Sequence, residues 1–248
     1  ADMIFVIGGE GGGTGTGAMP VIAQMAKETG AVVIGVVTMP FESEKARIDK
    51  AEFGLQELRE VTDTTIVLDN NRLVDIAGQL PLEQAFAVAN ELVSTMVKGI
   101  VETITLPSLI NLDYADVSTI MKNGGVAVIG IGESDTQERV SEAVKQALTH
   151  PLLDVDYKGA SGALIHVTCG PDLKLEEFDV IGRAVSENLS SDAQVIIGAR
   201  ISKDFVGKVR VITIMTGVKS PYVLGGDIET QSSPAEREMS DLGIEVWK

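Results

Sequence analysis

Residues 11–17 read Gly11-Gly12-Gly13-Thr14-Gly15-Thr16-Gly17, a glycine-rich heptad close to the start of the chain. The apolar run Met3–Ile7 before it is typical of a buried strand, and residues 18–27 after it have a helical pattern. A strand, a glycine-rich turn and a helix in this order favour phosphate binding, because glycine lets the backbone approach an anion and a helix N-terminus directs free N–H groups at it. We expect Thr14 and Thr16 to cap the helix or offer hydroxyls to phosphate, and Pro20 to fit its first turn.

Glycine-rich turns have other uses, so the heptad by itself leaves alternatives open. A tight structural connection explains it about as well as a phosphate site does. A P-loop is excluded, because neither Lys-Ser nor Lys-Thr follows the last glycine. A dinucleotide-binding oxidoreductase remains an alternative, although it requires an acidic residue roughly 20 residues on, at the end of the next strand. That strand, residues 31–37, is followed by Thr38-Met39-Pro40 instead.

The composition and the net charge limit the kinds of molecule that the protein is expected to bind. The chain has 248 residues, enough for one large domain or two modest ones, and a net charge of −16. Such a charge argues against binding nucleic acid through its phosphates and against direct docking on anionic lipid. Cys169 is the only cysteine, His150 and His166 lack ligand-like spacing, and nothing resembles a signal peptide or a membrane span. We therefore expect a cytoplasmic protein with no direct membrane insertion, and a structural role for the thiol.

The order of the predicted elements indicates an α/β fold. Apolar strands at residues 3–7, 31–37 and 64–68 alternate with helices, as in a parallel sheet that is covered on both faces. Pro81 then opens a helix over residues 82–104, roughly 35 Å long, whose wide apolar stripe predicts a buried strut between two domains.

The second half predicts a smaller α+β domain with a mixed sheet. Strands are expected at residues 124–131, 162–168, 194–200 and 208–216, with the last two paired antiparallel across a polar turn. Ser134-Asp135 is expected to cap a helix over residues 135–148. Residues 225–237 have the composition of a flexible linker, and Leu242–Trp247 is a short apolar end that could dock on the body as a strand or bind a partner.

A second motif follows the long helix, in the segment Asn111-Leu112-Asp113-Tyr114-Ala115-Asp116. Either aspartate could simply cap the short helix expected over residues 114–122, since Asp satisfies free N–H groups at a helix start. Two carboxylates three residues apart also lie on one face of a helix and could polarise a water or hold a hydrated Mg²⁺. The motif alone does not decide between these two roles.

Together, the two motifs resemble the tubulin/FtsZ superfamily. The heptad matches its signature, and residues 109–117 closely match the synergy loop of FtsZ, the prokaryotic tubulin relative, with the archaeal branch most similar. The resemblance extends from Ala1 to about Tyr222. It implies the C-terminal part of a Rossmann-like GTPase domain (residues 1–80), a central connecting helix (81–104), a smaller GTPase-activating domain with a mixed sheet (105–222) and an acidic linker with a short tail (223–248).

The resemblance also implies a mechanism. GTP, hydrolysed to GDP, would be held with Mg²⁺ on the glycine-rich face of one subunit, and the synergy loop of the next subunit in a head-to-tail homopolymer would complete the site. Asp113 and Asp116 would then orient the attacking water and the metal, with Asn111 in support. The phosphates would be held by Gly11, Gly12, Gly13, Thr14, Gly15, Thr16 and Gly17.

Four further positions match the family less closely. Glu44 and Arg47 resemble the pair that touches ribose and nucleotide, although they are three residues apart where the family usually has four. Phe86 resembles the aromatic residue against the guanine, and Asn90 replaces an Asp that reads the base edge. Without the resemblance, these residues would be interpreted as a surface ion pair, a core aromatic residue and a helix polar group.

The resemblance further implies a role in cell division at the division site, and a division-ring anchor or regulator as a partner of the tail. The chain opens on Ala1 and enters a strand at once, so we expect a fragment that lacks about three βα units and by itself binds GTP weakly or not at all. A filament-forming protein with little or no turnover is the main alternative function.

Overall fold

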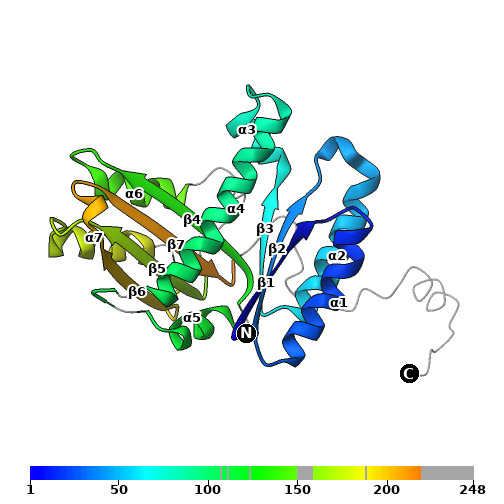
Figure 1. The fold of residues 1–248 in the computed structure, drawn as a ribbon, viewed down its shortest axis with the longest axis horizontal. Helices are drawn as coiled ribbons and strands as arrows, with labels where there is room; N and C mark the ends of the chain where they lie inside the picture. Colours follow the sequence, from blue (N-terminus) through cyan, green and yellow to red (C-terminus); the bar gives the residue numbers. More distant parts are fainter. Residues whose placement is uncertain (107, 111, 123, 150–158, 188, 219–248) are drawn as a thin grey trace, which may run out of the picture.

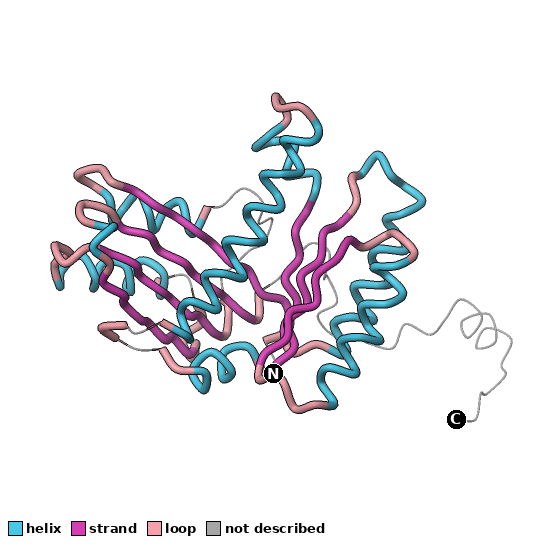
Figure 2. The backbone as a smooth tube through the Cα atoms, in the orientation of Figure 1, coloured by secondary structure: helices cyan, strands magenta, loops and turns pink. Residues whose placement is uncertain are grey.

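The computed structural model describes residues 1–106, 108–110, 112–122, 124–149, 159–187 and 189–218. Its core is a seven-stranded mixed sheet in the order β1-β2-β3-β4-β7-β5-β6 (Figures 1 and 2). The strands are β1 Met3–Gly9, β2 Val32–Met39, β3 Thr64–Asp69, β4 Gly125–Ser134, β5 Gly162–Cys169, β6 Gln194–Ile201 and β7 Val209–Thr216. The helices are α1 Thr14–Glu28, η1 Glu42–Arg47, α2 Ile48–Val61, α3 Asn70–Ala77, α4 Leu82–Thr105, α5 Tyr114–Met121, α6 Arg139–Leu148, α7 Leu175–Ser186 and η2 Lys203–Phe205.

The first three strands are parallel, which confirms the predicted α/β class. Their side chains alternate between two cores. On β2, Val33 and Val37 pack with α1 and α2, whereas Ile34 and Val36 pack with α4 and α5. Burial on both faces explains why these strands have continuous apolar sequences.

The two halves of the sheet are joined, because β3 and β4 pair in parallel over three residue pairs. One apolar cluster extends under both halves and includes Met96 and Ile100 of α4. Figure 1 shows α4 running across the middle of the molecule, between these halves. The prediction of a buried strut was only partly correct, because Leu82, Phe86 and Val101 on the same helix are exposed.

The predicted antiparallel pair between residues 194–200 and 208–216 was wrong. β7 lies between β4 and β5 and is antiparallel to both, while β6 pairs in parallel with β5. Almost every residue of β7 is buried, whereas Gln194 and Val195 of β6 are exposed. Burial therefore places β7 in the interior of the sheet and β6 at its edge.

The predicted cap of the helix over residues 135–148 was also wrong. Ser134 is the last residue of β4, and α6 begins at Arg139 with Glu138 as its N-cap. The Ser134 hydroxyl donates a hydrogen bond to Glu142 Oε2 at 2.6 Å, so it binds a side chain of the helix and not its backbone.

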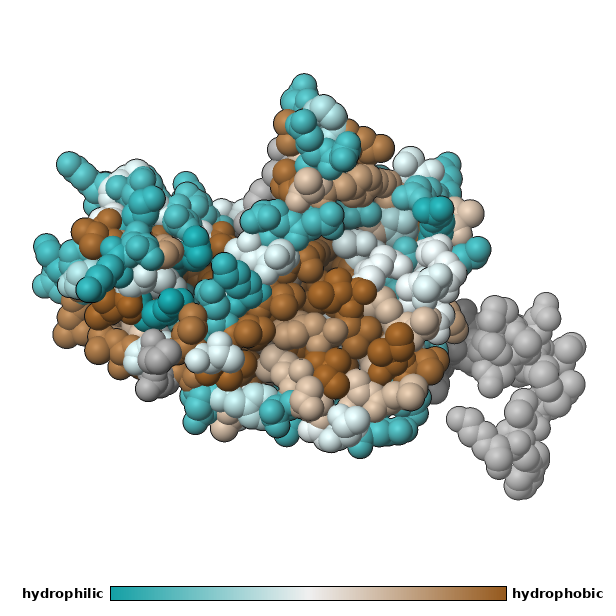
Figure 3. All heavy atoms as spheres, viewed as in Figure 1, coloured by the Kyte–Doolittle hydropathy of each residue, from teal (hydrophilic) through white to brown (hydrophobic). Residues whose placement is uncertain are grey.

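An apolar surface accompanies β1, which is the other edge strand. Figure 3 shows a broad hydrophobic area in the region of β1 and the lower part of α4. Ile7 on β1 and Val21, Ile22 and Met25 on α1 are exposed. Among the described helices, none is both long and apolar enough to cross a bilayer.

The buried His166 on β5 should make the stability of the fold depend on pH. Burial, and secondly the charge of Arg200, lower its pKa to about 4 from an ordinary value near 6.5. The neutral imidazole therefore stabilises the fold above pH 6.5, and this contribution is lost as the pH falls from 6.5 towards 4, by about 3 kcal/mol in total. Urea unfolding at pH 7.5 and pH 4.5 should show a stability loss about 2–3 kcal/mol larger for the wild type than for His166→Asn. Equal losses of stability in the two proteins would contradict the low pKa of His166 in the folded state.

Candidate active site

The glycine-rich turn connects β1 to α1 and starts the helix earlier than the sequence suggests. The first helical residue is Thr14, after Gly13 at the N-cap, so the prediction that Thr14 or Thr16 caps the helix was wrong. Instead, the Thr16 hydroxyl accepts a hydrogen bond from the Gly11 N–H at 2.9 Å and closes the turn. Pro20 consequently lies inside α1 and not in its first turn.

Two glycines of the heptad, Gly11 and Gly15, are required by the backbone of the turn, and others have free space beside them. Gly11 has a φ of 85°, which other residues rarely adopt. A Cβ on Gly15 would lie 2.0 Å from the Gly9 carbonyl oxygen, whereas at Gly12, Gly13 and Gly17 it would meet nothing within 4 Å. Gly12, Gly13 and Thr14 are exposed. The turn therefore presents accessible backbone at a helix N-terminus, where an anion can bind.

A buried carboxyl group lies beneath the turn. Glu10 is 5% exposed, and among the described residues neither of its carboxyl oxygens has a hydrogen-bond partner. Burial raises the pKa of Glu10, and the neighbouring Thr16 hydroxyl opposes this only in part. The raised pKa shifts Glu10 towards its neutral form, which repels a phosphate less than the carboxylate does. Sequence reasoning missed this residue, although a charged residue between an apolar strand and a glycine heptad was a visible signal.

Glu44 and Arg47 lie beside the turn in η1. Their side chains form an ion pair with 2.6 Å between Arg47 Nη1 and Glu44 Oε2, as the surface-pair interpretation predicts. Glu44 Oε1 also accepts a hydrogen bond from the Phe41 N–H. A Cβ on Gly11 would lie 2.8 Å from the Arg47 carbonyl oxygen, so η1 packs directly against the heptad.

Phe86 and Asn90 occupy one face of the first half of α4, four residues apart. Phe86 is 39% exposed, so the alternative that it is a core residue was wrong. Its ring meets the ring of Phe41 edge-on, with centroids 6.3 Å apart and planes at 69°. Asn90 is exposed. The structure thus brings Phe86 to the loop that carries Glu44 and Arg47.

Asp113 and Asp116 form a reciprocal cap at the start of α5. Asp113 Oδ1 accepts from the Asp116 N–H at 2.9 Å, and Asp116 Oδ2 accepts from the Asp113 N–H at 3.1 Å. The predicted capping role is therefore confirmed. Asp113 is exposed and Asp116 partly exposed, so the remaining carboxylate lone pairs can bind a water or a hydrated cation. Asn111 lies outside the described residues.

The two motifs lie at opposite ends of the chain's first strand. The Tyr114 hydroxyl donates to the Asp2 carbonyl oxygen at 2.5 Å, which places α5 at the start of β1. Gly9, the last residue of β1, lies seven residues after Asp2, and the heptad begins just beyond it at Gly11. Seven strand residues span about 23 Å. Figure 1 shows α5 beside the N-terminus, with β1 leading away from it. Within one subunit, the carboxylates therefore cannot reach an anion bound at the heptad.

Comparison with known proteins identifies this arrangement. Residues 1–78 match the Tubulin/FtsZ family, GTPase domain, and residues 125–219 match the FtsZ family, C-terminal domain. The chain belongs to the tubulin/FtsZ family. The predicted resemblance is confirmed, and membership of this family leaves no support for a dinucleotide-binding oxidoreductase.

Several FtsZ proteins are similar over most of this chain. Cell division protein FtsZ 2 of Halobacterium salinarum is 54% identical over 242 residues, 98% of this chain and 62% of that protein. Cell division protein FtsZ 2 of Methanocaldococcus jannaschii is 54% identical over 230 residues, 92% of this chain and 60% of that protein. The solved structure "FtsZ dimer, empty (M. jannaschii)" has a TM-score of 0.79 and 49% identity, over 88% of this chain and 64% of that one. The chain thus spans less than two thirds of the length of these relatives.

Proposed function

We propose that this chain is part of an FtsZ-type cytoskeletal GTPase that assembles head to tail for cell division and hydrolyses GTP to GDP at the contact between subunits. Family membership supports a GTPase, and a relative solved as a dimer supports self-association. The proposal places the protein in the cytoplasm at the division site, where the tail binds an anchor or regulator.

The observation that carries this proposal is the separation of the two motifs. The anion-binding turn and the Asp113/Asp116 pair lie about 23 Å apart at opposite ends of β1. Stacking a second copy along the direction of β1 brings its carboxylates to the turn of the first. A site divided between subunits in this way makes hydrolysis depend on assembly. Positioning and charge neutralisation are the main requirements of phosphoryl transfer, so groups from two chains suffice.

The nucleotide half of the site combines the heptad with the neighbouring loop and helix. In this proposal, the phosphates lie on the open backbone of residues 11–17, the ribose meets Glu44 and Arg47, and the base stacks on Phe86 beside Asn90. The T-shaped contact between Phe41 and Phe86 supports a common site, because it joins the Glu44 loop to α4. The exposed apolar edge at β1 is the kind of surface against which further βα units of a GTPase domain pack, and such units would complete the site.

The carboxylates also fit a magnesium ion. Mg²⁺ keeps several waters and needs only one or two carboxylates beside the phosphates of its nucleotide. The described residues contain no cluster of three or more potential ligands, and the exposed Asp113 with the partly exposed Asp116 suits this looser arrangement. When bound, the ion would neutralise phosphate charge. Asp113 and Asp116 would orient the attacking water, with Asn111 in support.

A substitution at Gly12 tests the phosphate contact. Gly12→Ala should fold normally, because its Cβ would meet nothing within 4 Å of the protein. It should weaken GTP binding about tenfold or more, because the methyl group keeps the phosphates away from the backbone. Titration of a fluorescent GTP analogue into the product of the whole gene, with ATP as competitor, measures this effect. Wild-type affinity for the variant would show that the phosphates do not lie on this face.

The alternative function is a filament component with little or no turnover. The measurement that separates the two functions is phosphate release per assembled subunit by the whole gene product, with Asp116→Ala as the control. Assembly with phosphate release no faster than in the control would favour the structural role.

A further inference from the structure

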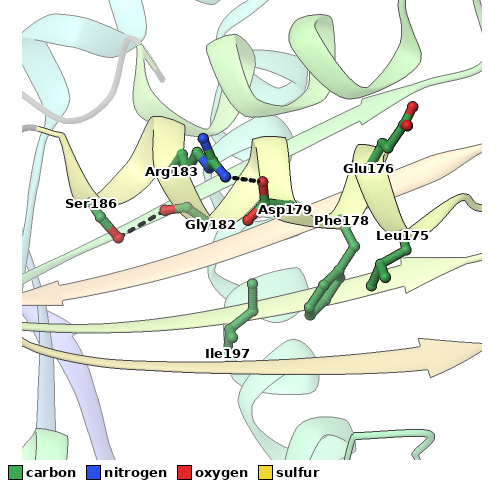
Figure 4. A pocket seen from close by; sticks show the side chains of 8 residues that line it. All are labelled: Leu175, Glu176, Phe178, Asp179, Gly182, Arg183, Ser186 and Ile197. Carbon is green, nitrogen blue, oxygen red and sulfur yellow. Dashed lines mark hydrogen bonds and ion pairs between the residues drawn. The ribbon is translucent and has the colours of Figure 1, made fainter.

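An apolar groove lies between α7 and β6, far from the nucleotide site. It has a volume of about 700 Å³ and is lined by Phe178, Gly182 and Ser186 of α7 and by Ile197 of β6, with Leu175 at one end. Figure 4 shows Phe178 and Ile197 facing each other across it, while the ion pair between Arg183 and Asp179 lies along the helix. Gly182 keeps the groove open, because a side chain there would fill it.

The groove adjoins an open strand edge. β5 is the only described strand that pairs with β6. On the other side, the Ala199 N–H and C=O bond to Leu109 and Ile110, which form an isolated antiparallel bridge at that point. Because backbone groups alternate along a strand, those of Val195 and Ile197 face the same edge. Another strand could continue from the Ile110 bridge and pair with them.

The chain itself contains a segment with the pattern of such a strand. In Leu242-Gly243-Ile244-Glu245-Val246-Trp247, the apolar residues Leu242, Ile244 and Val246 alternate with Gly243 and Glu245. A strand of this kind exposes one apolar face, which matches a groove lined by Phe178 and Ile197. The segment lies outside the described residues.

The last described residues of the chain lie close to this edge. Gly162 pairs with Thr216 of β7 on one side and with Gln194 of β6 on the other, so the end of β7 and the start of β6 lie in one row of the sheet. Two strand spacings amount to about 10 Å. The segment 219–241 has 23 residues, and a random-coil chain of that length would have a typical end-to-end distance of about 26 Å. At that distance residues 242–247 would be within reach of β6, at an effective concentration on the order of millimolar.

We propose that residues 242–247 dock on the same subunit as an added strand on the open edge of β6, with their apolar face in the α7–β6 groove. Main-chain hydrogen bonds to Val195 and Ile197 provide the affinity, and the groove provides the specificity. A partner of the tail would then compete with the subunit's own groove. This inference does not depend on the nucleotide chemistry.

A strand added to β6 donates main-chain hydrogen bonds, so amide hydrogen exchange of residues 242–247 reports docking directly. In the wild type, we expect alternate amides of this segment to exchange at least about tenfold more slowly than those of a free peptide. Gly182→Leu fills the groove, and Ile244→Asp spoils the apolar face of the tail without touching the body. Each should raise the exchange rate of these amides several-fold. Ser141→Leu, which places a leucine on the exposed face of α6, is the control and should leave the exchange rate unchanged.

Circular dichroism shows whether each variant is folded. If Gly182→Leu does not fold, Ile244→Asp still tests the proposal. Free exchange of residues 242–247 in the wild type, or protection that neither variant changes, would overturn the proposal. Protection that disappears on dilution would also overturn it, because the tail would then be docking on a second copy.

Discussion

Asp116→Ala is expected to reduce GTP hydrolysis by the assembled whole gene product at least about 100-fold, while GTP binding stays at the wild-type level. A positioned carboxylate that orients or activates a water contributes about 10²–10⁴-fold to a rate. GTP binding is spared because α5 lies at the start of β1, about 23 Å from the heptad of its own subunit. Phosphate release under conditions in which sedimentation shows assembly is the measurement.

Two variants on the same helix separate chemistry from capping. Asp116→Asn retains an oxygen that can accept from the Asp113 N–H, so it should fold like the wild type and still lose hydrolysis. Thr119→Ala removes an exposed hydroxyl that donates a hydrogen bond to the Ala115 carbonyl oxygen of the same helix, and it should keep wild-type hydrolysis. Full turnover in Asp116→Asn would mean that Asp116 only caps α5, at a value of about 1 kcal/mol.

Gly15→Ala should destabilise the protein by about 3 kcal/mol or more and abolish GTP binding. Its Cβ would lie 2.0 Å from the Gly9 carbonyl oxygen and 3.1 Å from the Gly9 carbonyl carbon. Both are backbone atoms at the end of β1 that cannot rotate away, so the turn itself has to move. Urea unfolding and a nucleotide titration measure the two effects.

Gly17→Ala is the matched control for this prediction. It makes the same chemical change two residues further on, where a Cβ meets nothing within 4 Å inside α1. Alanine favours a helix over glycine by about 0.5–1 kcal/mol, so this variant should be as stable as the wild type or more stable. If both variants unfold at the wild-type urea concentration, the close approach of Gly15 to Gly9 is not what fixes the turn.

Local patterns predicted most of the fold. Apolar runs located β1, β2 and β3, with glycine or proline beside β1 and β2 and Asn70-Asn71 after β3. The wide stripe after Pro81 located α4 to within one residue at its C-terminal end. Strand pairing in the second half was not predictable in the same way. The antiparallel pairing of β6 and β7 was inferred from their proximity in the sequence. In the structure β7, which is buried on both faces, lies between β4 and β5 instead. Continuous apolar sequence indicates that a strand is buried, but the choice of its neighbours depends on the whole sheet and leaves only a weak local signal.

For the candidate site, too, the sequence contained the motifs but not their arrangement in space. The heptad and the Asp113/Asp116 motif were each ambiguous alone, and their joint resemblance to the tubulin/FtsZ superfamily singled them out. The structure locates both. Their separation along β1 follows from topology and from the Tyr114–Asp2 contact, which no local pattern contains. Glu10 was missed because its importance comes from burial beneath the turn, and the roles of the residues around the nucleotide remain predictions.

A complementation experiment tests the divided site most directly. Gly12→Asp places a carboxylate in open space at the heptad, so the subunit should fold, fail to bind GTP and keep Asp113 and Asp116. Asp116→Ala should bind GTP and fail to hydrolyse it. Each whole-gene variant alone should be inactive, and the mixture should release phosphate, because the intact carboxylates of one variant meet the GTP held by the other. Co-sedimentation of the two variants without phosphate release would contradict a site shared between subunits.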